Sequence, residues 1–308
     1  MGAYARRRLV RAVPVIIGVM TLVFLMIHML PGDPAEEIAS RGPGMSPEAI
    51  QAIRVRLGLD KPLHVQYWDF VSRTVRGDLG RSILSNRAVS TMIREQLPAT
   101  AQLTIAGIIM AILIGVPLGI IAAVRQSSWV DSVSMTVALL GVAMPGFWLG
   151  LLLIFLFAVR LHWLPVIGGS GLRGLILPAF TLGFGAAAII ARLVRSSMLE
   201  VLRQEYMTTA RAKGLRQRSV ILRHGLKNAL IPVMTIVGLQ FGNLLGGAVV
   251  IETVFARQGI GRLAINAILA KDFPVIQGTV LFAALVYVSV NLTVDLLYSV
   301  VDPRIRYD

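Results

Sequence analysis

Few residues in this sequence have the types and spacing that catalysis or metal binding requires. The stretch 168–171 (Gly-Gly-Ser-Gly) matches the short G-x-S-G pattern of intramembrane serine proteases, but a serine nucleophile needs a base within hydrogen-bond reach. Of the histidines, His28 alone falls inside an apolar run, near its end, so a flexible glycine-serine turn is the favoured interpretation. The histidines also form no metal-binding spacing such as H-E-x-x-H, because they lie far apart at His28, His64, His162 and His224.

The sequence also lacks the usual motif for nucleotide hydrolysis. Glycine is nowhere followed by lysine, so the phosphate-binding pattern G-x-x-x-x-G-K-[ST] has no match. Cysteine is absent, which excludes disulfides, thiol chemistry and cysteine-bound metals. The sequence therefore predicts a chain that is not an enzyme and that carries no cofactor or metal of its own.

Polar side chains inside otherwise apolar runs are the remaining candidates, because such groups are costly in a membrane and are often functional. Gln240 and Asn243 lie in one such run, with hydrogen bonding between helices as the alternative to a functional role. Asp295 lies in another. We expect Asp295 to form a structural ion pair with Arg192 or Arg195, in preference to contacting a substrate.

The segments that hold these residues are strongly apolar. Hydrophobic residues make up 56% of the chain and charged residues 15%. Six stretches carry no Asp, Glu, Lys or Arg over 18 residues or more: 12–32, 96–124, 132–159, 174–191, 228–251 and 273–294. A helix needs about 20 apolar residues to cross a bilayer. The sequence predicts an all-α polytopic membrane protein with six transmembrane helices, and it excludes a soluble enzyme, a disordered chain and a membrane barrel of alternating strands.

The distribution of basic residues predicts the orientation. The net charge of +14 would suggest nucleic acid as a partner for a soluble protein, but here the basic residues are better explained as topological signals. With the N-terminus inside, the inner segments hold 16 Lys and Arg residues and the short outer loops hold five. We therefore expect both termini in the cytoplasm, a lipid bilayer around the spans and no nucleic-acid partner.

This orientation gives a domain organisation. Residues 1–30 form the cytoplasmic N-terminus and first transmembrane helix, 31–95 an extracytoplasmic loop with short helices, 96–301 the core transmembrane domain, and 302–308 a cytoplasmic tail. In the loop, apolar residues at helical spacing predict two helices that stop at Gly58 and Gly77. A cap packed on the spans is favoured over a docking surface for this loop.

The inner loop 192–227 is the most informative segment, with nine basic and two acidic residues. Residues 204–214 are helix formers that lead to a glycine placed as a C-terminal stop. Tyr206, Ala210 and Lys213 share one face of this helix, and Ser219 is expected to cap the next. One alternative is that the loop is basic only because basic residues fix the topology, and this alternative explains the charge. It does not explain a short helix with an Ala/Gly face, which suits insertion into a groove of a partner.

These residues resemble the cytoplasmic "EAA" loop of ABC importer permeases, in the variant typical of the dipeptide/oligopeptide/nickel/glutathione family. The Glu-Ala-Ala positions hold Thr208, Thr209 and Ala210, a departure that the peptide-type permeases share, so Glu205 is not the glutamate of the pattern. The dipeptide/glutathione subgroup is the nearest. Further matching stretches cover nearly the whole chain: 28–34, 57–62, 77–80, 246–252, 259–262 and 302–307.

The resemblance implies a type I ABC importer permease fold in the inner membrane of a prokaryote, forming the path for a small peptide. It implies a second homologous permease, two ATPase subunits that bind ATP and Mg, and an extracytoplasmic substrate-binding protein. Gln240 and Asn243 would line the path. Coupling to the ATPases would fall on Glu205, Tyr206, Thr209, Ala210, Ala212, Lys213 and Gly214. An ion-coupled carrier or channel is the alternative, but it predicts buried acids at mid-membrane, and Asp295 alone lies within a span.

Overall fold

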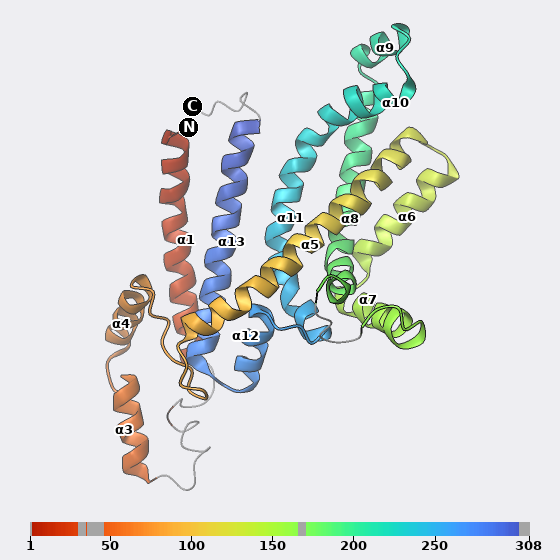
Figure 1. Ribbon diagram of the computed structural model, residues 1–308. Coiled ribbons are helices and arrows are strands. Elements are labelled where there is room, and N and C mark those ends of the chain that lie inside the picture. The colour runs from red at the N-terminus through yellow and green to blue at the C-terminus, as the bar shows by residue number, and fades with distance from the viewer. Residues whose placement is uncertain (1, 30–34, 36–45, 166–170, 302–308) are drawn as a thin grey trace. The chain divides into compact units, whose positions relative to one another are not determined.

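The computed structural model describes residues 2–29, 35, 46–165 and 171–301, and these residues are mainly helical (Figure 1). Within these ranges the chain forms no β-strand, apart from one isolated bridge between Arg81 and Ala88. The chain divides into two compact units. One comprises Met1–Pro98 with Gln258–Val288, and the other comprises Ala99–Arg257 with Ser289–Asp308. The expected core 96–301 is thus shared between the two units.

The first unit holds α1 (Gly2–Met29), α3 (Pro47–Leu57), α4 (Leu63–Val75), the first residues of α5, α12 (Ile260–Leu269) and most of α13 (Phe273–Val301). Aromatic side chains join α1 to α4: the rings of Phe24 and Tyr67 meet edge-on with centroids 5.3 Å apart. Both expected helix stops are confirmed. Gly58 and Gly77 follow α3 and α4 with φ of +70° and +80°, a conformation that a Cβ disfavours.

A buried carboxylate anchors the segment that follows α4. Asp272, between α12 and α13, accepts a hydrogen bond of 2.5 Å from the Ser82 hydroxyl and one of 3.1 Å from the backbone N–H of Ile83. Asp272 is 3% exposed, and these bonds offset the loss of its hydration. The segment is thereby fixed against the start of α13.

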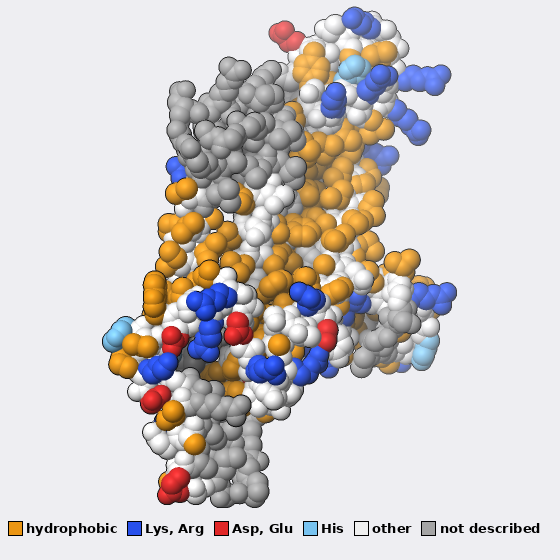
Figure 2. Space-filling view, turned by 60° about the vertical axis from the view of Figure 1, so that its left-hand side comes forward, with side chains coloured by type: hydrophobic (Ala, Val, Ile, Leu, Met, Phe, Trp, Pro, Cys, Tyr) orange, Lys and Arg blue, Asp and Glu red, His pale blue; other side chains and the backbone are white. Residues whose placement is uncertain are grey.

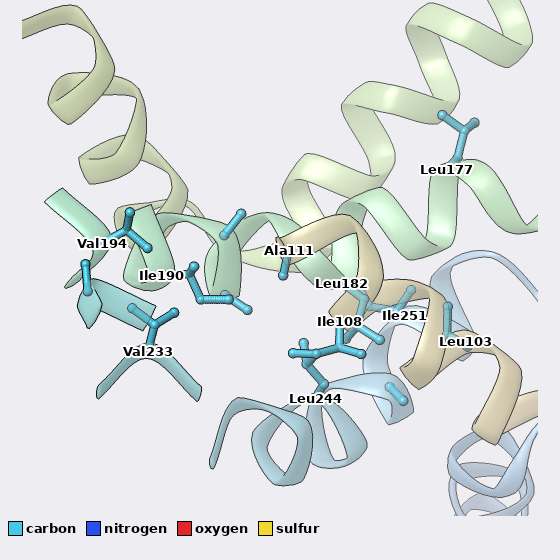
Figure 3. Close-up of a cluster of buried hydrophobic side chains, with 14 of the residues drawn as sticks. Leu103, Ile108, Ala111, Leu177, Leu182, Ile190, Val194, Val233, Leu244 and Ile251 are labelled. Carbon is cyan, nitrogen blue, oxygen red and sulfur yellow. The ribbon is translucent and has the colours of Figure 1, made fainter. Parts of the chain in front are cut away.

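The second unit is built around α8 (Arg173–Leu202), which is buried along most of its length and packs against α11 (Leu226–Val254) and α6 (Trp129–Ala143). Leu182 and Ile190 of α8 lie at the centre of its apolar core, shown in Figure 3. The other labelled members come from α5 (Val89–Val124), α8 and α11: Leu103, Ile108, Ala111, Leu177, Val194, Val233, Leu244 and Ile251.

Glycines bring α5 and α8 into direct backbone contact. A Cβ added to Gly115 would lie 2.6 Å from the carbonyl oxygen of Ala187, and one added to Gly119 would lie 2.5 Å from that of Ala191. A Cβ on Gly183 of α8 would in turn collide with the backbone of α5. Small residues allow this approach, which maximises van der Waals contact between helices in lipid.

The third apolar run, 132–159, is broken in two. α6 ends at Ala143, and α7 (Gly146–Leu153) continues into a π-helical turn (Ile154–Arg160), bent by 107° from α6. Pro145 explains the break, because a proline disfavours helical geometry at the residue before it, and Met144 is extended with ψ of 124°. The third expected span is therefore present as two helices that meet at a sharp bend.

The described residues do not establish the expected count of six spans. Four described stretches are long and apolar enough to cross a membrane, and the bent pair makes a fifth if it counts as one span. The apolar part of α1, Val10–Met26, is shorter than the other spans. All six apolar runs do fall on helices within the described residues, but the count of six is not confirmed. The four long stretches are Val89–Val124, Arg173–Leu202, Gln217–Val254 and Phe273–Val294.

Candidate functional site

A short helix, α9 (Glu205–Ala212), lies in the loop between α8 and α11, as the sequence predicted. Gln204 precedes it in an extended conformation, and its carbonyl accepts a 3.0 Å hydrogen bond from the N–H of Met207. Gly214 ends the turn after the helix with φ of +74°, the expected glycine stop. Figure 1 shows α9 at the end of the second unit where α8 ends, which is also the end where α5 turns into α6.

Two buried side chains hold α9 on its own chain. Met207 and Ala210, three residues apart on one helix face, pack against Val220 with support from Val201 and Leu202. The burial of Ala210 departs from the expected face of Tyr206, Ala210 and Lys213, because the short helix must bury its one apolar stripe to be stable at all. Ala210 therefore packs on the buried side of α9 and is not part of its outer surface.

The outer surface of α9 is formed by the other candidate coupling residues. Tyr206 is 42% exposed. The remaining exposed members are Glu205, Thr209, Ala212, Lys213 and Gly214.

The helix that follows α9 begins earlier than expected. Ser219, the expected cap, lies inside the helical stretch, which starts at Gln217 as α10 (Gln217–Ser219) and runs through a π-helical turn (Val220–Gly225) into α11. Gly225 lies beneath α9, where a Cβ would come 3.4 Å from the Met207 Cε and 3.5 Å from the Met198 Cε. The absence of a side chain at Gly225 thus leaves space for Met198 and Met207 beneath α9.

A polar contact that the sequence analysis did not find connects α9 to α11. Asn228 Nδ2 donates hydrogen bonds to the Tyr206 hydroxyl at 3.0 Å and to the carbonyl of His224 at 3.1 Å. A polar residue in the first turn of an apolar helix only weakly indicates a contact. The two partners are 22 positions apart in the sequence, so no local pattern predicts that they pair.

The surface around α9 is strongly basic. Figure 2 shows Lys and Arg side chains gathered at the α9 and α10 end of the second unit, above helices covered by hydrophobic side chains. None of the basic side chains of this surface forms an ion pair with another described residue. The basic side chains of this surface are therefore available for an acidic partner. They are Arg203, Arg211, Lys213, Arg216, Arg218, Arg223 and Lys227.

The structure gives Arg195 a partner that the sequence analysis did not name. Its Nε and one terminal nitrogen each donate to a carboxylate oxygen of Asp131 at 2.7 Å, a bidentate pair that joins α8 to the first turn of α6. Arg192 is exposed. The side chain of Asp295 lies outside those that the structure describes, so its expected pairing stays a prediction.

The two polar candidates of α11 contact each other. Asn243 Nδ2 donates a 2.9 Å hydrogen bond to Gln240 Oε1 within the same helix. Gln240 is buried and Asn243 is exposed. Gly238 packs on Val294 of α13, and Gly246 has open space beside it. The exposed amide of Asn243 and the open surface at Gly246 thus lie one turn apart on the same side of α11.

A bundle of apolar helices with a short exposed helix between two of them, in a basic loop, is the arrangement expected of a membrane permease of the ABC importer class. The chain matches the family described as binding-protein-dependent transport system inner membrane component over residues 115–307. It also matches the N-terminal part of such membrane components over residues 1–104. The chain belongs to this family of inner-membrane transport permeases, which work with ATPase and substrate-binding-protein partners.

Known proteins agree with this assignment. The chain is 47% identical over 304 residues to the glutathione transport system permease protein GsiC of Escherichia coli O6:H1 (strain CFT073), and 46% identical to that of strain K12, with 99% of each chain covered. In fold it is similar to the inward-facing MetNI methionine ABC transporter, with a TM-score of 0.59, 18% identity and coverage of 68% of this chain and 96% of the other. An amino acid ABC transporter with histidines gives a TM-score of 0.52.

Proposed function

We propose that this permease carries a small peptide of the glutathione or di/oligopeptide kind. The relatives named for glutathione transport share nearly half of their residues with this chain over almost its full length, and that similarity is the observation on which the substrate class depends. Gln240 and Asn243 are proposed to line the path, because amide groups can hydrogen-bond a peptide backbone as it passes.

The energy for transport is proposed to come from two partner ATPases, which bind ATP and Mg and grip α9. The exposed Tyr206 and Lys213, the basic surface around them and the absence of a Gly-Lys pair from the sequence support this division of labour. A force on α9 passes into α8 and α11 through Met207 and the Asn228 contact. Rigid-body motion of packed helices is a known route to such switching.

The complete importer is proposed to contain a second, homologous permease beside this one. Both termini and the α9 end are proposed to face the cytoplasm, with residues 31–95 outside and residues 302–308 as a cytoplasmic tail. The excess of basic residues in the inner segments supports this orientation.

Reconstitution tests the proposed function. Proteoliposomes that contain both permeases and the ATPases, with binding protein on the substrate side, are expected to take up radiolabelled glutathione or dipeptide only when ATP is supplied to the ATPases. Uptake by this chain alone, driven by an ion gradient without ATP, would instead establish the secondary-carrier alternative.

A further inference from the structure

A cavity of about 340 Å³ lies within the first unit, and the transport roles above do not use it. It is bounded by the end of α1, by α4, by the segment anchored on Asp272 and by the start of α13. Its volume is in the range of small-molecule sites, about 300–1,000 Å³. The rings of Phe24, Phe70 and Phe273 give it an apolar lining.

Several polar groups of the lining are already paired with one another. Lys61 Nζ donates to Asp69 Oδ2 at 2.8 Å, and this hydrogen bond, together with the lysine charge, holds the pKa of Asp69 below its ordinary value. The Asp69 carboxylate is therefore ionised at neutral pH and engaged by Lys61. His28 Nε2 lies 3.1 Å from Gln66 Oε1, and the Gln66 amide nitrogen donates to two backbone carbonyls.

Three lining groups retain unused hydrogen-bonding capacity. Arg73 donates from Nε to the Asp69 carbonyl at 3.2 Å, while its two terminal nitrogens have no partner among the described residues. Asp78 Oδ1 accepts the Gly80 N–H at 2.9 Å, and its second oxygen is unpaired within the same ranges. The Gln277 amide also makes no hydrogen bond there.

The backbone holds the cation and the anion close together. The N–H of Asp78 donates to the carbonyl of Arg73 at 3.0 Å, in the turn that Gly77 makes at the end of α4. Arg73 and Asp78 nevertheless form no ion pair with each other in the described structure. Opposite charges that line one cavity but remain separate are complementary to a ligand that carries both signs.

We propose that this cavity binds a small zwitterionic solute. Its carboxylate lies on the Arg73 guanidinium, whose planar fork suits bidentate binding, and its ammonium group lies on Asp78. The phenylalanine rings contact the apolar body between the two charges. A short peptide is such a zwitterion, so the inference deepens the proposed function and rests on it for the identity of the ligand.

Equilibrium dialysis of the full chain in lipid nanodiscs, without ATPases or binding protein, tests the proposal with radiolabelled dialanine as the probe. Saturable binding is expected. Dialanine that is acetylated at its N-terminus or amidated at its C-terminus is expected to compete with the probe about tenfold more weakly. The Arg73→Gln and Asp78→Asn variants are expected to bind the probe about tenfold more weakly. In each case one charged hydrogen bond is lost. Arg76→Gln is the matched control, because Arg76 is exposed on the same turn but does not line the cavity.

The outcomes separate this inference from the proposed function. Folded wild-type chain that binds no dialanine, or an Arg73→Gln variant that binds as well as Arg76→Gln, would overturn the cavity proposal. Stronger displacement of the probe by phosphatidylethanolamine than by unlabelled dialanine would overturn it too, in favour of a lipid headgroup. ATP-driven peptide uptake by the complete importer is a separate readout, and its absence would count against the proposed function.

Discussion

The side-chain amide of Asn228 donates a 3.0 Å hydrogen bond to the phenolic oxygen of Tyr206, across the boundary between two helices. Tyr206 belongs to α9, and Asn228 belongs to the first turn of α11. The contact therefore links the exposed short helix to the helix that carries Gln240 and Asn243. A displacement of α9 reaches α11 through this bond as well as through the buried methionine beneath it.

Tyr206→Phe and Asn228→Ala are each expected to lower substrate uptake per ATP hydrolysed. We expect a loss of about threefold, or ~0.6 kcal/mol, and no further loss in the double variant, because both changes remove the same interaction. The measurement is the ratio of uptake to ATP hydrolysis in proteoliposomes. Thr208→Ala, exposed on the same helix, is the control. Additive losses in the double variant would show that the bond does not couple the two residues.

Gly214→Val is expected to abolish coupling while leaving membrane insertion intact. Gly214 has φ of +74°, where a β-branched residue is strained by about 1–2 kcal/mol, so the turn that ends α9 must rearrange. Gly171→Val provides a matched control. Gly171 has φ of +84° and, like Gly214, has no atom near its missing Cβ, but it lies far from α9 in the chain. Equal loss of ATP-driven uptake in both variants would contradict a specific role for Gly214.

Arg195→Met is expected to lower the free energy of unfolding by about 2–3 kcal/mol, less than for a fully buried pair because the Arg195 side chain is 27% exposed. Arg195→Lys should lose less, since it keeps the charge but not the bidentate geometry. Thermal unfolding in mild detergent measures both. Arg192→Met, on the exposed side of α8, should be nearly neutral. If Asp295→Asn destabilised the chain more than Asp131→Asn, the aspartate in α13 would be the principal partner.

Gly119→Ala is expected to destabilise the chain by about 1–3 kcal/mol, because its Cβ would lie 2.5 Å from a backbone carbonyl oxygen that cannot move aside as a side chain can. Gly246→Ala should be neutral or slightly stabilising, since the Cβ there has open space and alanine favours the helix. Expression level and thermal midpoint of the two variants provide the comparison. Similar midpoints would show that α5 can shift away from α8 at little cost.

Local features of the fold followed from sequence because they depend on neighbouring residues. Gly58, Gly77 and Gly214 each end a helix in the left-handed region, as glycine after a run of helix formers predicts. The apolar runs gave the long helices for the same reason. A proline within a span predicts a kink, but the size of the bend at Pro145 depends on the helices packed around it and does not follow from local sequence.

Pairings between distant residues were beyond the reach of the sequence. Asp131 lies 64 residues before Arg195 and just outside the charge-free run 132–159, so no local pattern links the two residues. The cavity beside Arg73 needs α1, α4 and α13 to come together, and no local pattern encodes that meeting. The sequence does not show that Ala210 is buried, because an alanine can either leave room for a partner on an exposed helix face or pack against the protein's own core.

At three points the contact of α5 with α8 brings backbone against backbone: Gly115 lies on the carbonyl of Ala187, Gly119 on that of Ala191, and Gly183 on that of Gly107. Side chains that interdigitate can exchange rotamers and let one helix slip past another, but bare peptide planes in contact have nothing to exchange. If the helices move during transport as proposed, we therefore expect these stretches of α5 and α8 to move together as one rigid body.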